Sequence, residues 1–243
     1  MIVIVYAAGI SSRLSSIAKN GLKGLIKING KRIIEYQLEW IAKLPIKKIV
    51  IVLGLEHKEY IDFLGDSFMG KEISYVINPD YKHKGNMLSL WHARKYCNDD
   101  VIFTTSDLLC NRKDIDEFIQ SDYRNKILID RDSVNLFIDS DPVKVHIENK
   151  RIIKIRKKTN EIDRVDGISV GIYKFSKTAI MKMISSIDKK IIDDNDDLSL
   201  YYAIDDILDD EIVKPVYTVN SEWFDIDTPE DLKKATLSVE KIF

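Results

Sequence analysis

The sequence is poor in the features that mark several classes of protein. Its 243 residues include only two cysteines, Cys97 and Cys110, which are neither closely spaced nor part of a ligand motif. This usage is typical of reduced thiols in a cytosolic protein and does not indicate a disulfide framework. No apolar run approaches the roughly 20 residues that a membrane-spanning helix needs, and the N-terminal apolar run is too short for a signal peptide. We therefore expect a cytoplasmic protein with no membrane insertion.

An excess of charge of one sign is also missing. The chain has 37 basic and 39 acidic residues, dispersed along its length, and a formal net charge of −2. Without a basic block or an acidic tail, neither a nucleic-acid partner nor a disordered tail is indicated. Signatures of the Ser-His-Asp and Cys-His kinds are absent, so nothing indicates a protein nucleophile. Four scattered histidines lack the spacing of metal ligands: His57, His83, His92 and His146.

What is present begins at the N-terminus, where the apolar run at residues 2–6 leads into a loop of small residues. When a buried strand is followed by such a loop, backbone N–H groups are left without partners in the protein, and this arrangement suits the binding of phosphate. Lys23, ten residues after the loop, adds a positive charge. The segment matches neither the dinucleotide fingerprint nor the Walker lysine loop, so a ligand-free turn stays an alternative. The loop residues are Ala7, Ala8, Gly9, Ser11, Ser12 and Arg13.

Apolar runs and helical patterns alternate through the first half of the chain. After the first strand, the pattern predicts strands at residues 47–54, 73–77 and 101–105 and helices at about 33–44, 58–64 and 86–96. This order predicts a parallel sheet covered on both faces. Ligands of such sheets sit beyond the carboxyl ends of the strands. The residues at those positions are Gly9, Gly54, Asn78, Pro79 and Asp107.

From about residue 126 the pattern changes to short strands that Asn, Asp and Gly interrupt, which predicts antiparallel pairs in a smaller mixed lobe. A hairpin is expected at Glu148, Asn149 and Lys150, and the last helix should begin with Thr228 as N-cap and Pro229 in its first turn. No linker interrupts the chain, so we expect one domain over 1–243, with halves of about 1–125 and 126–243. The strands are expected at 126–130, 143–148, 152–157, 168–175 and 213–219, and helices near 177–186 and 198–208.

Acidic residues follow predicted strands at two places. A nucleoside triphosphate ligand requires Mg²⁺, because charge develops when an α-phosphate is attacked, and loop carboxylates are suitable ligands for that ion. Asp107 is one candidate, and Asp225 and Asp227 form the second. Alternatively, Asp107 is a turn residue that caps the helix after Asn111. Asp225 and Asp227 would then be local support for the Thr228 cap.

Together these motifs resemble the sugar-phosphate nucleotidyltransferase superfamily over nearly the whole chain. They are the loop at residues 7–14, Lys23-Gly24-Leu25, Gly30-Lys31, the strand end at Asp107 and the block at residues 223–228. Residues 78–81, 85–90 and 141–145 resemble the CTP:phosphocholine cytidylyltransferase branch, which includes enzymes acting on other small phosphorylated alcohols and phosphonates. In two departures from the superfamily, Ser11 replaces the second glycine of the loop and Leu22 replaces a proline before the lysine.

The resemblance implies an α/β fold of Rossmann-like type: a mixed, mainly parallel sheet flanked by helices, as in nucleotide-diphospho-sugar transferases, with a small antiparallel lobe. It implies catalytic roles for Arg13, Lys23 and Lys144, with Lys144 as a further candidate for the acceptor's phosphate and a solvated strand lysine as its alternative. Mg²⁺ would be held by Asp107 and Asp227, with Asp225 as a further candidate. The implied nucleotide-binding residues are Ala7, Ala8, Gly9, Ser11, Ser12, Arg13, Asn86, Ser89 and Asp107.

The implied reaction transfers CMP from CTP to a small phosphorylated or phosphonate acceptor and releases pyrophosphate, supplying an activated headgroup or surface decoration. An ionised acceptor oxygen can attack the α-phosphorus in line without a protein base. A phosphocholine-like acceptor would need an aromatic cage, an amine-bearing aminoethylphosphonate or amino-acid phosphate would need carboxylates, and a polyol phosphate would need neutral polar groups. The aromatic candidates are Tyr173, Tyr201, Tyr202, Trp223 and Phe224, and the acidic ones are Asp194, Asp196 and Asp197.

Other functions stay open at this point. One is a sugar-1-phosphate uridylyl- or guanylyl-type nucleotidyltransferase, since the sequence does not decide between CTP and UTP. Another is a glycosyltransferase that uses Asp225 and Asp227 as its Asp-x-Asp pair, which would leave Arg13 and Lys23 unexplained. The third is a non-catalytic nucleotide-binding subunit. The sequence also leaves the oligomeric state open, a homodimer included.

Overall fold

The first half of the chain builds a parallel sheet. The computed structural model describes residues 1–9, 11–14, 17–18, 22–46, 48–54, 58–82, 85–134, 142–193 and 198–242. Within them, β1 (Ile2–Ala7) lies between β4 (Lys48–Leu53) and β7 (Val101–Thr105), and β6 (Lys71–Ile77) lies beyond β4. All of these pairs are parallel, as predicted. The central strands are almost completely apolar and buried because helices cover both faces.

Strands of the second half extend the same sheet. Antiparallel pairing of β12 (Gly167–Phe175) with β7 joins the two halves. Beyond β12 lie β10 (Lys144–Glu148) and β11 (Arg151–Arg156), which form the predicted hairpin, with Asn149 and Lys150 at φ of 48° and 57° in its turn. Off this path, β9 (Lys126–Asp130) pairs with β12 and in parallel with β13 (Lys214–Tyr217), while β5 (Ser67–Phe68) closes the other edge.

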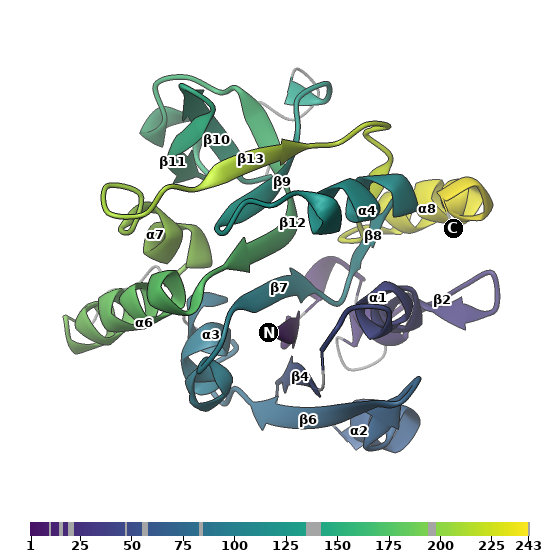
Figure 1. Ribbon diagram of the computed structural model, residues 1–243. Coiled ribbons are helices and arrows are strands. Elements are labelled where there is room, and N and C mark those ends of the chain that lie inside the picture. The colour runs from purple at the N-terminus through teal and green to yellow at the C-terminus, as the bar shows by residue number, and fades with distance from the viewer. Residues whose placement is uncertain are drawn as a thin grey trace.

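Two groups of helices enclose the sheet (Figure 1). On one face, α1 (Ile33–Ala42), α2 (Lys58–Leu64) and α4 (Arg112–Gln120) contribute to one apolar core. On the other face, α3 (Met87–His92), α6 (Lys177–Ile192) and α7 (Leu200–Asp205) contribute to a second. The helix expected at 86–96 is shorter than predicted, because a separate 3₁₀ turn covers Arg94–Tyr96. Within the described ranges, no helix has both the length and the apolar character that crossing a bilayer requires.

Short elements complete the fold beside the sheet. Strands β8 (Leu108–Cys110) and β14 (Trp223–Asp225) form an antiparallel pair, and β2 (Lys27–Ile28) pairs with β3 (Lys31–Arg32). A third apolar cluster packs this region against α8 (Pro229–Ile242), which is the helix predicted to begin after Thr228.

The caps of two helices settle the alternatives for the acidic residues. Thr228 caps α8 as predicted: its Oγ1 accepts from the Asp231 backbone N–H (3.2 Å), and its own N–H donates to the Asp231 carboxylate (2.8 Å). Asn111 caps α4, with its side chain accepting from the Lys113 N–H at 2.9 Å. Asp107 is therefore not the cap of α4, and Asp231 supplies the carboxylate that completes the α8 cap.

Candidate active site

Two adjoining cavities open at the carboxyl ends of the parallel strands. The smaller measures about 250 Å³ and lies where β1, β6 and β7 end, and the larger measures about 730 Å³ and reaches across to β12 and β14. Tyr6, Asn86 and Thr105 line both. The position agrees with the expectation that ligand-binding residues follow the strand ends.

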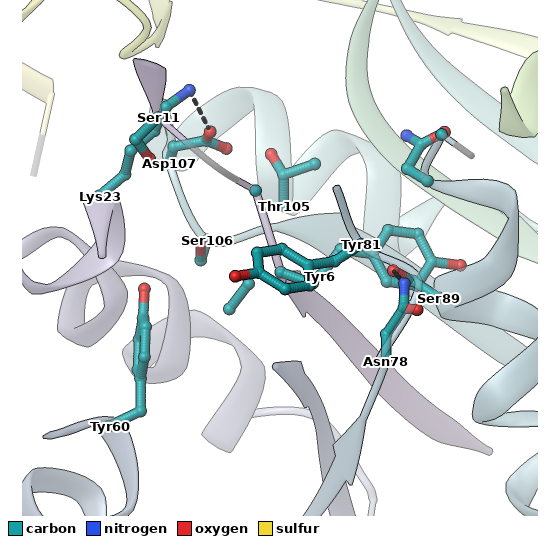
Figure 2. A pocket seen from close by; sticks show the side chains of 15 residues that line it. Tyr6, Ser11, Lys23, Tyr60, Asn78, Tyr81, Ser89, Thr105, Ser106 and Asp107 are labelled. Carbon is teal, nitrogen blue, oxygen red and sulfur yellow. Dashed lines mark hydrogen bonds and ion pairs between the residues drawn. The ribbon is translucent and has the colours of Figure 1, made fainter. Parts of the chain in front are cut away.

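The smaller cavity has two chemically different ends, which Figure 2 shows. At one end, Lys23 Nζ lies 3.1 Å from Asp107 Oδ2. At the other, the buried side chains of Asn78 and Ser89 meet, with Asn78 Nδ2 donating to Ser89 Oγ at 3.2 Å. An ionic end suits phosphates, whereas an amide and a hydroxyl suit the polar edge of a base.

The N-terminal loop lines the smaller cavity with Ala7, Ala8, Gly9 and Ser11. Ser11, which stands at the position of a family glycine, has a φ of 48° and is almost completely buried. A non-glycine residue rarely adopts this left-handed backbone conformation. The serine therefore keeps a glycine-like backbone at this point of the loop. Ser12 and Arg13 follow in a 3₁₀ turn at Ser12–Leu14.

Gly54 and Gly85 act through close approach of the backbone. A Cβ atom on Gly54 would lie 2.9 Å from Tyr81 Cδ2, so this glycine makes room for Tyr81 and does not itself line either of these two cavities. Gly85 has a φ of 69°, and a Cβ atom there would lie 2.7 Å from the carbonyl oxygen of Leu198. The backbone of Gly85 therefore lies close to that of Leu198, at the junction between the starts of α3 and α7.

Asn86 continues that junction. Its Oδ1 accepts from the backbone N–H of Leu200 at 2.9 Å, while the N–H of Met87 donates to the carbonyl of Leu198 at 2.9 Å. Because Asn86 lines both cavities, the α3 and α7 junction forms part of the wall between them.

Three carboxylates predicted to bind metal converge beside the junction of the cavities. β14 pairs with β8 so that Asp225 lies opposite Leu108, the residue after Asp107, and the N–H of Ile226 donates to the carbonyl of Asp107 at 3.1 Å. One oxygen atom from each of Asp107, Asp225 and Asp227 lies within 4.8 Å of the others. An all-oxygen set of acidic ligands fits a hard divalent cation such as Mg²⁺.

Two cationic side chains balance the carboxylates. Lys23 bonds to both Asp107 and Asp227, and Arg13 Nη2 lies 2.5 Å from Asp227 Oδ2. Although desolvation opposes the charge on Lys23, the neighbouring carboxylates raise its pKa above the ordinary value. Asp225 opens on the larger cavity, but the protein atoms around the cleft desolvate it. This desolvation and the charges of Asp107 and Asp227 raise the pKa of Asp225 well above its usual range.

Tyr60 belongs to the site although the sequence did not single it out. Its side chain extends from α2 with the hydroxyl toward Ser106 (Figure 2), and a Cβ atom on Gly24 would lie only 2.4 Å from that hydroxyl oxygen. The hydroxyl is hydrogen-bonded to the Ser106 side chain and the Gly24 backbone. One buried tyrosine thus links the residue after Lys23 to the residue before Asp107. The sequence pattern around Tyr60 is that of a helix core and carries no sign of this contact.

Most of the aromatic candidates line the larger cavity. Tyr173 stacks on Phe103 with ring centroids 4.9 Å apart. Tyr202 is not in the lining, and its hydroxyl donates to Glu161 at 3.0 Å. The acidic candidates Asp194, Asp196 and Asp197 lie outside the described residues. The aromatic candidates in the lining are Tyr173, Tyr201, Trp223 and Phe224.

Lys144 stands apart from Arg13 and Lys23. It is the first residue of β10 and is 1% exposed, and its Nζ donates to the carbonyl oxygens of Lys157 (2.8 Å) and Pro142 (3.2 Å). Pro142 and Lys157 line the larger cavity, whereas Lys144 does not. The structure therefore places the Lys144 ammonium behind the cavity wall.

Known proteins share this sequence pattern and fold. The model of the nucleotidyl transferase family matches residues 2–242. The CTP:phosphoglutamine cytidylyltransferase of Campylobacter jejuni subsp. jejuni serotype O:2 is 24% identical over 254 residues, which cover 96% of this chain and 98% of the relative. The choline-phosphate cytidylyltransferase of Streptococcus pneumoniae is 25% identical over 238 residues, which cover 96% of each chain. The inositol-1-phosphate CTP transferase from T. maritima has the same fold, with a TM-score of 0.81 at 23% identity over 99% of this chain and 95% of that structure. The chain therefore belongs to the nucleotidyl transferase family, in agreement with the resemblance of its motifs.

Proposed function

We propose that the protein is a Mg²⁺-dependent cytidylyltransferase, which transfers CMP from CTP to a small phosphorylated or phosphonate acceptor and releases pyrophosphate. One observation carries the proposal: Asp107, Asp225 and Asp227 converge with Lys23 where a polar cavity meets a larger aromatic one. A reaction between two phosphate-bearing substrates needs this combination of carboxylates, cation and paired cavities.

CTP would occupy the smaller cavity. The Asn78 and Ser89 end offers hydrogen-bonding groups to the base, and the Lys23 end offers a cation to the triphosphate. This orientation brings the α-phosphate toward Asp107, beside the larger cavity. Cytidine is supported as the nucleoside by the relatives, two of which are named as cytidylyltransferases.

The metal site follows from the donor set. Asp107, Asp225 and Asp227 would hold Mg²⁺, which when bound supplies positive charge to the phosphate oxygens. Without such a cation, three carboxylates beside a triphosphate would repel it strongly.

The chain's own cations would serve the transfer itself. The acceptor's phosphate oxygen attacks the α-phosphorus and forms a new P–O bond, while the bond to the β-phosphate breaks and its electron pair leaves with pyrophosphate. A phosphate acceptor is largely ionised at pH 7, so no protein base has to take a proton. Lys23 and Arg13 would exchange their carboxylate partners for phosphate oxygens and stabilise the charge that develops.

The acceptor would enter the larger cavity. The names of the relatives and of the similar structure include phosphoglutamine, choline phosphate and inositol 1-phosphate, all small phosphorylated compounds. Such compounds fit a cavity of about 730 Å³. Its lining includes the aromatic side chains of Tyr173, Tyr201 and Trp223, while Ser169 and Ser199 add hydroxyl groups.

A pyrophosphate-release assay tests the proposal. CTP, UTP, ATP and GTP are each incubated with Mg²⁺ and one acceptor from a panel: phosphocholine, aminoethylphosphonate, an amino-acid phosphate and inositol phosphate. We expect release with CTP and at least one acceptor, at a rate more than about tenfold above that with the other nucleotides, because base-reading hydrogen bonds discriminate strongly. A preference for UTP or GTP would contradict the cytidylyl assignment, and no release with any pair would contradict transfer to this class of acceptor.

A further inference from the structure

We propose that Asp130 is a positioning residue: it fixes strand β14 so that Asp225 and Asp227 face Asp107 while Trp223 forms the wall of the larger cavity. This inference rests on the proposed function, because it concerns the metal ligands and the acceptor cavity of that reaction. Asp130 itself lines neither cavity.

Asp130 ends β9 and is completely buried. Its Oδ2 accepts from the indole Nε1 of Trp223 at 2.8 Å, and its Oδ1 accepts from the hydroxyl of Ser221 at 2.9 Å. The backbone N–H groups of Asp132 (2.9 Å) and Ser133 (3.3 Å) also donate to Oδ1. A buried carboxylate bound in this way holds its donors firmly, since charged hydrogen bonds in a dry environment are strong.

Strand β14 needs an external clamp. It is only three residues long, and its pairing with β8 consists of Trp223 opposite Cys110, Phe224 opposite Leu109 and Asp225 opposite Leu108. A short strand has weak intrinsic register, and a slip of one residue turns every side chain to the opposite face. The bond from Asp130 to the first residue of β14 opposes such a slip.

One strand carries parts of both binding sites. Trp223 and Asp225 are two residues apart on β14, and both line the larger cavity, as does Phe224 between them. A displacement of Trp223 therefore also displaces Asp225. Asp227 follows directly, with its N–H bonded to the carbonyl of Asp225 at 3.1 Å.

The turn before β14 has a second, independent anchor. The buried carboxylate of Asp114 on α4 accepts from the backbone N–H groups of Val219 (2.6 Å) and Asn220 (3.2 Å). The segment thus remains attached to the protein when Asp130 is altered. Loss of the Asp130 bonds should change the position of β14 more than it changes the fold.

Asp130→Asn is the test variant, because an amide keeps the size but replaces one acceptor oxygen with a donor. The measurements are the dissociation constant of Mn²⁺, followed by electron paramagnetic resonance without substrates, and the KM of the acceptor. We expect the Mn²⁺ constant to rise about tenfold or more, as is usual when a partner that orients metal ligands is removed. The acceptor KM should rise several-fold, while metal-free CTP binding stays unchanged.

Asp166→Asn is the matched control. This carboxylate also anchors a backbone group, accepting from the N–H of Ile147 at 2.9 Å, and it pairs with Arg164, but it lines neither cavity. The control should bind Mn²⁺ as the wild type does. If Asp130→Asn fails to fold, Ser221→Ala, which removes one donor, should still raise the Mn²⁺ constant two- to threefold.

The outcomes separate this inference from the proposed function. The positioning role alone would be overturned if a folded Asp130→Asn protein kept the wild-type Mn²⁺ affinity and acceptor KM. If Asp130→Asn does not fold, an unchanged Mn²⁺ dissociation constant in Ser221→Ala would overturn it. A wild-type protein that neither binds Mn²⁺ nor releases pyrophosphate would overturn the proposed function, and the inference with it.

Discussion

The ammonium group of Lys23 lies among the carboxylates proposed to bind metal: it is 3.1 Å from Asp107 Oδ2 and also bonds to Asp227. Because Arg13 bonds to the same aspartate, two cations of the protein neutralise part of the acidic cluster. A divalent cation entering this cluster meets their repulsion, whereas a nucleotide offers both cations new anionic partners. The contact therefore favours joint binding of metal and nucleotide.

Lys23→Met should strengthen metal binding and weaken catalysis at the same time. Removing one positive charge beside the cluster should lower the Mn²⁺ dissociation constant of the substrate-free protein by about tenfold, or about 1.4 kcal/mol. Transfer should fall by about a hundredfold or more, because a cation that stabilises phosphate charge is lost. Lys48→Met, which removes a lysine paired with Glu72 at 2.7 Å, is the control and should leave both quantities unchanged. An unchanged or weaker Mn²⁺ affinity in Lys23→Met would contradict this account.

Gly85→Ala should loosen the junction between α3 and α7. The new methyl group would lie 2.7 Å from the Leu198 carbonyl at a φ of 69°, so we expect a loss of about 3 kcal/mol in the free energy of unfolding and weaker CTP binding. Gly65→Ala is matched in backbone conformation, with a φ of 65° and no atom within 4 Å. It should cost only about 1 kcal/mol in urea unfolding and leave CTP binding intact. Equal losses in the two variants would show that the contact with Leu198 is unimportant.

Tyr60→Phe removes only the hydroxyl that links Gly24 to Ser106. Since that link sets the position of Lys23 relative to Asp107, kcat/KM should fall by about fivefold, as expected for a lost hydrogen bond of about 1 kcal/mol at a reacting site. Tyr75→Phe removes a hydroxyl that donates to the Gly65 carbonyl, away from both cavities, and should have wild-type kinetics. Identical kinetics in the two variants would exclude the positioning role of Tyr60.

Asp130 should also contribute a pH-dependent part of the stability. Burial opposes its ionisation, but the hydrogen bonds from Ser133, Trp223, Ser221 and Asp132 lower the pKa of Asp130 in the folded protein. Its contribution is therefore present above the unfolded carboxyl pKa of about 3.9 and is lost as the pH falls through the folded value. The difference in free energy of unfolding between wild type and Asp130→Asn should be constant above about pH 5 and shrink below about pH 4.

Comparing the two proteins at each pH cancels the titrations that they share. The exception is Asp114, because burial and, in part, the charge of Asp130 raise the pKa of its carboxyl group. A difference that stays constant down to pH 3, or that grows on acidification, would contradict the bound, ionised state of Asp130.

Much of the parallel half could be predicted because its strands are buried on both faces. Strands β1, β4 and β7 read as continuous apolar runs, and their predicted ends agree with the structure to within one or two residues. The residues beyond those strands, Asp107 among them, could then be named as candidates, because ligands of parallel sheets bind beyond the carboxyl ends of the strands. Asp225 and Asp227 could be named in the same way as the second pair of candidates, and the family resemblance implied Asp107 and Asp227 as the metal ligands.

The arrangement that brings the carboxylates together could not be predicted. Strands β8 and β14 have three residues each, too few for a periodic pattern, yet their pairing places Asp225 beside Asp107. The roles of Tyr60 and Asp130 depend on contacts across the tertiary structure, which spacing does not encode. Lys144 shows the converse: the family resemblance implied a phosphate contact, whereas its ammonium donates to the carbonyl oxygens of Pro142 and Lys157 behind the wall.

The rate of pyrophosphate release as a function of Mg²⁺ concentration, in wild type and Asp107→Asn, tests the central claim most directly. Asp116→Asn, which removes a carboxylate paired with Arg112 on the surface of α4, serves as the control. With CTP and a productive acceptor, the wild-type and control rates should vanish in EDTA and rise to saturation with Mg²⁺. The Asp107→Asn rate should stay about a hundredfold or more below them at every concentration. A rate and Mg²⁺ dependence in Asp107→Asn equal to those of the wild type would contradict the account.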